Sequence, residues 1–409
     1  MGSVNIVTVV ERRLGVCVES PVSVLFVTHH LPWPTTSGGR QREAQLLQVL
    51  AGRHNIEIVA VTKALESDRS GVAYARELGL TVRLFAASRS RHVLKSSLAR
   101  RHGSSDARRY LSHRLADDST VVHVEGHYLL PVVARSAWSR TLLIEHNVES
   151  MLLRQQAALS TKSSLRVFLD TGRTATLERR AWRNVAVVGA LSVDDAAVIR
   201  SAAPATDVCV LPSGADHLLA ARSGGSGGGA PSVDAIFVAN FGYAPNREAV
   251  RTLVTEIFPR VTADLPHARL AIAGGAPPAW LIDASRHERR LLVPGWIDDL
   301  SAWLHAAKVV VCPLRIGGGI KIKMLEAVAA ARCIVTTSVG VQGLSERVKN
   351  ALVIRDDPES FAQAVIALLR SDRLRNGYQI AMAAAAKTLP TWQASAADLE
   401  ACWLRLAGR

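Results

Sequence analysis

The chain has 409 residues, of which 48% are hydrophobic and 21% charged, and its 49 Lys and Arg residues outnumber 35 Asp and Glu residues. This length exceeds one ordinary hydrophobic core and favours two domains. The composition is that of a globular protein and excludes a largely disordered one, and the absence of any run of 18 apolar residues excludes a membrane-spanning helix.

The N-terminus and the cysteines indicate where the chain resides. Residues 1–20 contain one short apolar run interrupted by Glu11, Arg12 and Arg13, which is a poor match to a signal peptide. We expect an N-terminal extension there. The five cysteines are odd in number, far apart and without a C-x-x-C pair, a pattern that argues against a disulfide framework or a zinc site and predicts a reducing cytoplasm.

Apolar runs alternate with helical patterns through the first half of the chain. Continuous apolar runs are typical of parallel strands buried on both faces. The alternation therefore predicts an α/β, doubly wound parallel sheet over residues 21–220. The strands predicted in it lie at residues 22–30, 56–62, 81–87, 121–125, 141–146, 185–191 and 207–211, with helices at 42–51 and 74–78 among them.

A change of composition separates the two halves. Residues 221–232 read ARSGGSGGGAPS, which is the composition of a flexible linker. A second doubly wound domain is predicted over residues 233–388, and in segment 389–409 a final helix that we expect to pack back toward the N-terminal domain. Ligands of such sheets bind outside the carboxyl ends of the strands, so two facing domains predict a cleft.

The elements predicted beyond the linker repeat the same alternation. Strands are expected at residues 235–240, 268–274, 291–295, 309–314 and 333–337, and helices from about 246 and at 299–306, 320–331 and 391–406.

Much of the excess positive charge lies in residues 83–114, where Arg, Lys and His recur. One interpretation is a solvated, arginine-rich surface, and a second is attraction to anionic membrane lipid or to an anionic acceptor. Nucleic acid is the weakest of the three partners, because the stretch lacks interleaved aromatic residues for base stacking and no recognition motif accompanies it.

The most informative stretch joins a strand to a helix through three glycines, Gly317–Gly319. Glycine lets the backbone approach a ligand closely, and the free N–H groups and positive dipole end of the following helix favour phosphate. Lys321 and Lys323 lie in or beside the first turn, and Glu326 follows within reach of sugar hydroxyls. The alternative is an ordinary helical surface with solvated lysines.

Polar residues also follow two predicted strands of the first domain. His29 and His30 end the first strand, and Glu145, His146 and Asn147 end another. Because functional side chains gather at such ends, these residues are candidates for acceptor or donor contact, although a histidine there can simply cap a loop. Asp298 and Asp299 are expected to cap the helix that follows Gly295.

Taken together, these segments resemble a known family. The stretch at residues 313–343, PLRIGGGIKIKMLEAVAAARCIVTTSVGVQG, resembles the C-terminal signature of the retaining group 1 (family 4) glycosyltransferases of GT-B fold, in a branch with a GGGxKxKxLEA motif. Further similar segments, in the same order, are VLFVTHHLPWPTTSGGRQRE, EHNVES, LERRAWRNVAVV, LPSGAD, FVANFGYAPNREAV, RLAIAGG and VPGWIDDLSAWLHAAKVVVCPL, so the resemblance covers nearly everything from Val22 onward.

The resemblance implies two Rossmann-like domains and transfer of a sugar from a nucleoside-diphosphate sugar to an acceptor hydroxyl. It further implies a hexosyltransferase-type enzyme that retains the anomeric configuration, and we expect a UDP- or GDP-sugar as the donor. No D-x-D element stands out, so we expect no metal and no tightly bound cofactor.

Site residues follow from the resemblance position by position. Glu326 would bind the ribose, Gly318, Gly319 and Ile320 with Lys321 and Lys323 the diphosphate, and Val293 and Gly295 would border the base. Across the cleft, Gly38 and Gly39 would face the donor phosphate and His127 the transferred sugar. The implied catalytic residues are His127, Glu326 and Lys321.

Two departures from the family pattern concern the phosphates. Gly318 stands where the family often has a second glutamate, and the segment ANFGYAPN lacks the usual Arg and Lys, although Arg247 is close. Lys321 and Lys323 are the candidates to neutralise the diphosphate instead.

Other functions stay open. A sugar-nucleotide epimerase or phosphorylase shares the two-domain fold, a non-catalytic sugar-nucleotide-binding protein would lack turnover, and nucleic-acid binding would show a steep salt dependence. The expected location is the cytoplasm, with peripheral contact at the inner face of an anionic membrane.

Overall fold

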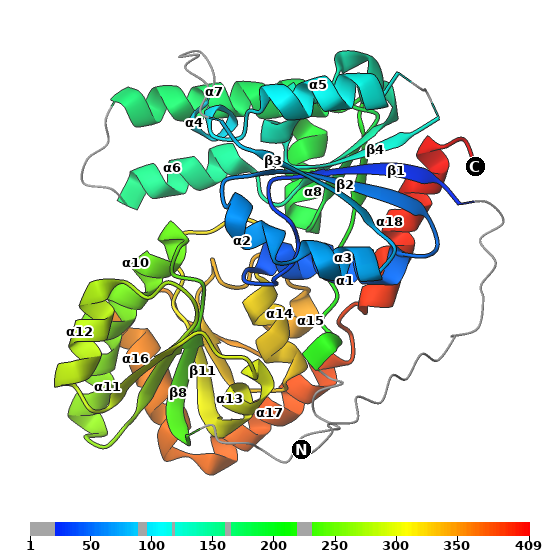
Figure 1. Cartoon of the computed structure of the whole chain (residues 1–409). Coiled ribbons are helices and arrows are strands. Elements are labelled where there is room, and N and C mark those ends of the chain that lie inside the picture. The colour runs from blue at the N-terminus through cyan, green and yellow to red at the C-terminus, as the bar shows by residue number, and fades with distance from the viewer. Residues whose placement is uncertain (1–20, 89–95, 117–118, 160–164, 219–230) are drawn as a thin grey trace, which may run out of the picture.

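The computed structural model describes residues 21–88, 96–116, 119–159, 165–218 and 231–409. It contains two α/β domains, drawn one above the other in Figure 1. The predicted extension at residues 1–20 lies outside these ranges, as do residues 221–230 of the predicted linker and residues 89–95 of the basic stretch.

The N-terminal domain is built on seven parallel strands in the order β3-β2-β1-β4-β5-β6-β7. Successive side chains of β1 alternate between its faces, so that Val24 and Phe26 enter one core cluster while Leu25 and Val27 enter another. All seven predicted strands are present. They are β1 (Ser23–Thr28), β2 (Asn55–Thr62), β3 (Thr81–Ala86), β4 (Val121–Glu125), β5 (Thr141–Glu145), β6 (Val187–Ala190) and β7 (Asp207–Val210).

Helices cover both faces of this sheet (Figure 1). They are α1 (Gly38–Leu50), α2 (Leu65–Arg69), α3 (Val72–Glu77), α4 (Ser97–Arg100), α5 (Ser105–Arg114), the 3₁₀ segments η1 (His127–Val132) and η2 (Arg135–Arg140), α6 (Glu149–Leu159), α7 (Leu165–Trp182) and α8 (Val193–Ala202).

The C-terminal domain has six parallel strands in the order β10-β9-β8-β11-β12-β13. The five predicted strands are present, and a short sixth, β13, was missed because two residues carry no periodicity. The strands are β8 (Val233–Val238), β9 (Leu270–Ala273), β10 (Leu291–Gly295), β11 (Ala307–Cys312), β12 (Ile334–Thr336) and β13 (Val353–Ile354). The helices are α10 (Ala244–Thr252), the π-helical turn η3 (Leu253–Ile257), α11 (Phe258–Asp264), α12 (Ala279–His287), α13 (Leu300–Ala306), α14 (Ile322–Ala329), α15 (Glu346–Lys349), α16 (Pro358–Arg370) and α17 (Asp372–Ala386).

Both sheets reverse their strand order beside their first strand. In each, the first three strands run one way from that strand and the later strands run the other way. Ligands of open α/β sheets bind at this switch point, outside the carboxyl ends of the strands. The switch points lie between β1 and β4 and between β8 and β11. A ligand is therefore expected to bind at the loops that follow these four strands.

The last helix, α18 (Trp392–Leu406), crosses back and joins the N-terminal core. Its Trp392, Leu399 and Trp403 are buried in the cluster that also contains Phe26 and Leu47. Figure 1 shows it beside α1 and the N-terminal sheet. Within the part of the chain that the structure describes, no helix has the length and apolar character needed to cross a membrane.

The prediction for the first helix was wrong at its start. The expected helix began at residue 42, but α1 begins at Gly38, because the Ser37 hydroxyl accepts a hydrogen bond from the Arg40 N–H and caps it. Glycine rarely favours a helix, which is why the two glycines were assigned to a loop. The predicted helix at 74–78 is also divided differently, into α2 and α3.

Candidate functional site

The glycine loop lies where the two domains touch. It follows β11 and precedes α14, and Gly319 has a positive φ of 59°. A Cβ atom on Gly319 would lie 2.2 Å from the carbonyl oxygen of His146 in the N-terminal domain, and one on Gly318 would lie 3.1 Å from Cβ of Asn147. The backbone of the loop therefore approaches the segment after β5 closely, which a side chain would prevent.

Two lysines stand at the start of α14, of which Lys321 is buried and Lys323 partly buried. Lys321 Nζ donates to the carbonyl of Gly319 and to Oε1 of Gln342, each at 2.9 Å, and Lys323 Nζ donates to Oδ1 of Asn246 at 2.6 Å. Burial lowers the pKa of Lys321 to about 8 and also lowers the pKa of Lys323. Among the described residues neither lysine has a carboxylate partner, so an anion would stabilise both.

Glu326, one turn further along α14, faces a histidine of the segment that follows β7. Its Oε1 lies 3.3 Å from Nε2 of His217. The other ring nitrogen of His217 accepts the indole N–H of Trp392 at 3.0 Å. The Glu326 side chain is 14% exposed, so part of it can still meet a ligand.

The predicted base-binding residues lie across the sheet from this loop. Val293 and Gly295 belong to β10, which is three strand spacings, about 14 Å, from β11. That is a separation that a nucleoside diphosphate can span. Trp296 follows them with half of its surface exposed, and its indole donates to Asp298. Asp299 caps α13 as predicted, but the prediction that Asp298 also caps it was wrong.

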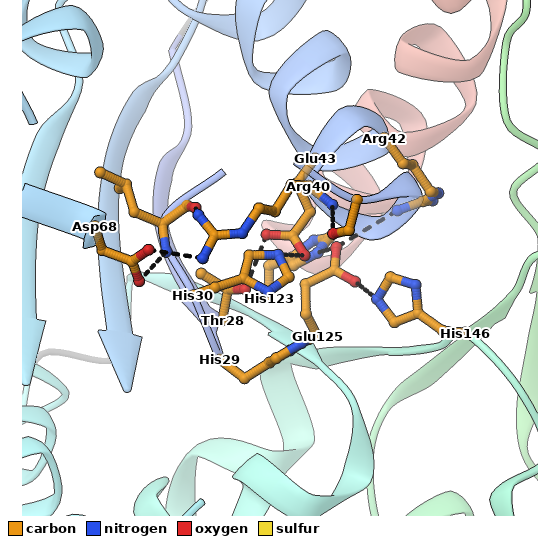
Figure 2. Close-up of polar contacts among 12 residues, drawn as sticks. Thr28, His29, His30, Arg40, Arg42, Glu43, Asp68, His123, Glu125 and His146 are labelled. Atoms are coloured by element: carbon orange, nitrogen blue, oxygen red, sulfur yellow. Dashed lines mark hydrogen bonds and ion pairs between the residues drawn. The ribbon is translucent and has the colours of Figure 1, made fainter. Parts of the chain in front are cut away.

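In the N-terminal domain the strand-end histidines enter a buried polar cluster, shown in Figure 2. His30 Nε2 lies 3.0 Å from Oε1 of Glu43, whose other oxygen accepts the Thr28 hydroxyl at 2.8 Å. His29 Nδ1 lies 3.1 Å from the hydroxyl of Tyr128. Burial and the neighbouring His30 lower the pKa of His29 well below its usual range, so this imidazole is neutral at pH 7.

His127 and Glu145 form a buried ion pair. Nδ1 of His127 lies 3.1 Å from both carboxylate oxygens of Glu145, and the indole of Trp182 donates to the same carboxylate at 2.8 Å. Burial opposes a charged imidazole, but the Glu145 carboxylate outweighs it and raises the pKa of His127 to about 9. Among the described residues, Nε2 of this imidazolium is buried without a hydrogen-bond partner, which marks it as a donor for a ligand.

The carboxylate of Glu125 contacts His123, His146 and Arg42. Its Oε1 accepts from Nε2 of His123 at 2.8 Å, and its Oε2 lies 2.6 Å from Nε2 of His146. Arg42 approaches the same carboxylate at 3.5 Å (Figure 2). The two pairs are thus crossed, since Glu125 at the end of β4 holds the histidine after β5, and Glu145 at the end of β5 holds the histidine after β4.

One group of side chains in the described ranges has a spacing compatible with a metal ion. Donor atoms of Glu43, Glu125 and His146 all lie within 4.8 Å of one another. Arg42, however, already supplies positive charge to Glu125, and His30 contacts Glu43. Both carboxylates therefore have side-chain partners within the protein.

Gly38 and Gly39 occupy the first turn of α1. A Cβ on Gly38 would come 3.1 Å from Cγ1 of Ile322 at the start of α14, so this turn packs directly against the C-terminal domain. Two hydrogen bonds close the same interface, from Asn240 Nδ2 to the carbonyl of Thr36 and from the Gly317 N–H to Gln155 Oε1, both at 3.0 Å.

The structure therefore brings predicted site residues together from the two sides of one domain interface. His29, His30, His127, Glu145, His146 and Asn147 lie on the N-terminal side, and Gly318, Gly319, Ile320, Lys321, Lys323 and Glu326 on the C-terminal side. Sequence reasoning missed Glu125 and His217. Glu125 ends a predicted strand, which was a usable signal, whereas nothing local distinguishes His217.

Comparison with known proteins bears on the domain family and on the fold. Residues 232–371 match the family model described as glycosyl transferases group 1. No curated protein sequence matches the chain significantly.

Three solved structures are similar to this chain in fold. Sucrose-phosphate synthase from Thermosynechococcus elongatus has a TM-score of 0.69 at 16% identity, covering 94% of this chain and 99% of that one. Anabaena HepE in complex with UDP has a TM-score of 0.62 at 13% identity, covering 94% and 100%. WaaG, a glycosyltransferase involved in lipopolysaccharide biosynthesis, has a TM-score of 0.60 at 13% identity, covering 93% and 99%.

These similarities establish the fold. The two parallel-sheet domains form a GT-B structure, as the resemblance implied. The C-terminal domain carries a group 1 glycosyltransferase domain.

Proposed function

We propose that this chain, with its group 1 glycosyltransferase domain, transfers a hexose from a UDP- or GDP-sugar to an acceptor hydroxyl with retention of configuration. The observation that carries the proposal is a pair of lysines, Lys321 buried and Lys323 partly buried, beside the glycine loop at the switch point of the C-terminal sheet. Among the described residues neither has a carboxylate partner. Such a site suits a diphosphate.

The chemistry required is stabilisation of a leaving diphosphate. Negative charge grows on it as the glycosidic bond breaks, and cations and N–H groups already aimed at that position lower the barrier. Loss of one such donor typically costs about 3 kcal/mol, or roughly a hundredfold in rate. Lys321, Lys323 and the start of α14 supply this charge, and Glu326 binds the ribose. On the opposite side of the interface His127 offers a buried, unpaired N–H to the sugar.

The first experiment measures binding of UDP, GDP, ADP, CDP and TDP by calorimetry. One nucleotide should bind, and Glu326→Ala should weaken it about tenfold, because a hydrogen bond to a charged group is lost. Glu359→Ala, an exposed glutamate of α16 in the same domain, is the matched control and should leave binding unchanged. If none of the five nucleotides binds, the glycine loop is not a phosphate site and the proposal fails.

Alternative reactions separate in a turnover assay with the nucleotide sugar identified in this way. A transferase forms product only with an added hydroxyl acceptor, an epimerase converts the donor alone, and a phosphorylase requires inorganic phosphate. Nuclear magnetic resonance of the product then reports the anomeric configuration. A product of inverted configuration would contradict retention but would leave the proposed donor-binding site unaffected.

No metal is needed in the proposed reaction, because the lysines neutralise the diphosphate and the carboxylates at Glu43 and Glu125 already face Arg42 and His30. Activity should survive EDTA. Its abolition by EDTA and recovery with magnesium would show instead that an ion completes the site.

We further propose an anionic membrane surface, at its cytoplasmic face, as a partner of the N-terminal domain. Leu165, Phe168 and Leu169 are exposed on one face of α7, and Arg101, Arg108 and Arg109 are exposed on or beside α4 and α5. Figure 1 shows these helices on the side of the sheet away from the C-terminal domain. Apolar side chains flanked by arginines match an anionic bilayer.

Vesicle sedimentation tests this partner. The protein should bind vesicles with anionic lipid at low salt but not neutral ones, and Phe168→Ser should weaken binding. Ile380→Ser is the matched control, because Ile380 is equally exposed on α17 of the other domain. Equal binding of both variants, or none by the unmodified protein, would rule out this surface.

A further inference from the structure

Helix α18 carries two tryptophans that belong to the N-terminal core cluster. Trp392 and Trp403 are eleven residues apart, which is about three helical turns and about 16 Å along the axis, so they project from nearly the same face. Both are buried. Each donates its indole N–H to a histidine, and each of these histidines faces a glutamate of the site.

The first chain of hydrogen bonds lies in the N-terminal domain. Nε1 of Trp403 donates to Nδ1 of His123 at 3.2 Å, and Nε2 of His123 lies 2.8 Å from Oε1 of Glu125. All three side chains are fully buried. Glu125 in turn holds His146, which lies against the glycine loop.

The second chain reaches the C-terminal domain. Nε1 of Trp392 donates to Nδ1 of His217 at 3.0 Å, and Nε2 of His217 lies 3.3 Å from Oε1 of Glu326. Figure 1 shows α18 in red beside the N-terminal sheet, entered from the chain segment that leaves the C-terminal domain.

The direction of both chains is fixed by chemistry. An indole N–H can only donate, so Nδ1 of His123 and of His217 must be the unprotonated acceptor. The proton of each neutral imidazole is then on Nε2, where it donates to the carboxylate. Both glutamates are thereby held as hydrogen-bond acceptors in one orientation.

We propose that α18 positions one carboxylate on each side of the domain interface, Glu125 and Glu326, through these two Trp–His–Glu chains. Trp392, His217, Trp403 and His123 are positioning residues in this arrangement. None of them need touch substrate, and their influence on the reaction rests on the proposed function. Helix α18, which follows the C-terminal domain in the chain, thus fixes the orientation of one glutamate in each domain.

The test that is independent of activity is the tautomer of each histidine. In the full chain with ¹⁵N-labelled histidine at pH 7, nuclear magnetic resonance should show His123 and His217 protonated at Nε2 only. Trp403→Phe should introduce the Nδ1-protonated tautomer at His123 alone, and Trp392→Phe at His217 alone. Histidines protonated at Nδ1 in the unmodified protein, or tautomers that ignore both substitutions, would overturn the proposal.

Kinetics separate the two chains from a merely structural effect. Trp392→Phe should raise the nucleoside-diphosphate Kd about tenfold, because Glu326 loses its orientation. Trp403→Phe should leave that Kd unchanged and lower kcat about tenfold through Glu125 and His146. Leu399→Ala, a buried residue of the same helix, is the control that should lower Tm without changing either tautomer. Loss of the same parameter in all three variants would mean that α18 acts only through packing.

His123→Gln covers the case in which Trp403→Phe does not fold. A glutamine can accept from Trp403 and donate to Glu125, so it should retain most of kcat, whereas His123→Leu should lose it. Equal activity of these two variants counts against positioning. If no sugar transfer is found while the tautomers behave as expected, the proposed function fails and the positioning of the two glutamates stands.

Discussion

At the scale of single residues, the charges near the domain interface are set by named neighbours. His127 is an imidazolium because Glu145 lies 3.1 Å away and outweighs the burial that opposes its charge. Lys321 has no such carboxylate among the described residues, and burial lowers its pKa to about 8. The pKa values of the two residues are therefore shifted in opposite directions.

The lowered pKa of Lys321 predicts that diphosphate binding depends on pH. Its ammonium is charged below about pH 8 and is lost as the pH rises through that value, while a diphosphate binds the charged form. The Kd for the bound nucleotide should therefore rise between pH 7.5 and 9.5, by at most about tenfold per pH unit. Lys321→Arg, which stays charged, should flatten the profile. A flat profile for the unmodified protein would show that Lys321 does not contribute charge.

His127 predicts a pH dependence of stability. Its folded pKa of about 9 lies above the usual 6.5, so the stabilisation is complete below about pH 6.5 and is lost as the pH rises through 9. Glu145→Gln removes the cause of the shift. The fall in Tm between pH 6 and pH 9.5 should be smaller in this variant than in the unmodified protein. The same fall in both proteins would mean that the pair does not titrate in this range.

At the scale of elements, two glycines differ in how closely other parts of the chain pack against them. Gly377 is exposed within α17, and a Cβ there would meet no atom within 4 Å. Gly214 precedes the segment with His217, and a Cβ there would lie 2.4 Å from the backbone N of Trp392. The first is free of tertiary constraint, and the second packs against the start of α18.

Substitution of these two glycines tests that distinction. Gly377→Ala should stabilise the protein by about 0.5–1 kcal/mol, because alanine loses less conformational freedom in a helix. Gly214→Ala should destabilise it, since the new methyl group must displace backbone. Chemical denaturation followed by circular dichroism measures both free energies of unfolding. A gain for Gly214→Ala would mean that α18 is not held closely at its start.

At the scale of the whole molecule, the two domains meet through backbone at the glycine loop. Gly319 has a left-handed φ of 59° and lies against His146, so it is constrained twice. Gly319 is therefore the position in this loop at which domain closure can be tested.

Gly319→Ala should prevent the observed approach of the domains. We expect a loss of about a hundredfold in kcat, because displacement by about 1 Å is enough to misplace reacting groups, and a larger radius of gyration in X-ray scattering. Gly377→Ala, where a Cβ would meet no atom within 4 Å, is the control and should change neither quantity. If Gly319→Ala keeps full activity and an unchanged radius of gyration, contact at this loop is not required for the reaction.

Much of the fold and part of the site could be predicted from the sequence. Strand periodicity is local, so the strands that position His29, Glu145 and the glycine loop were predicted, and parallel packing brings their carboxyl ends together. The start of α1 was misplaced because helix propensity disfavours Gly38 and Gly39, while the Ser37 cap and the contact with Ile322 favour a helix there.

The two doubly wound domains and the residue types at their strand ends thus follow from local sequence patterns. Which of these residues pair depends on the tertiary fold. The crossed pairs of Glu125 with His146 and of Glu145 with His127 depend on β4 and β5 lying side by side. The bond between Trp403 and His123 joins residues 280 positions apart. Periodicity describes the few residues around each position, whereas hydrogen bonds of this kind exist only after the chain has returned on itself.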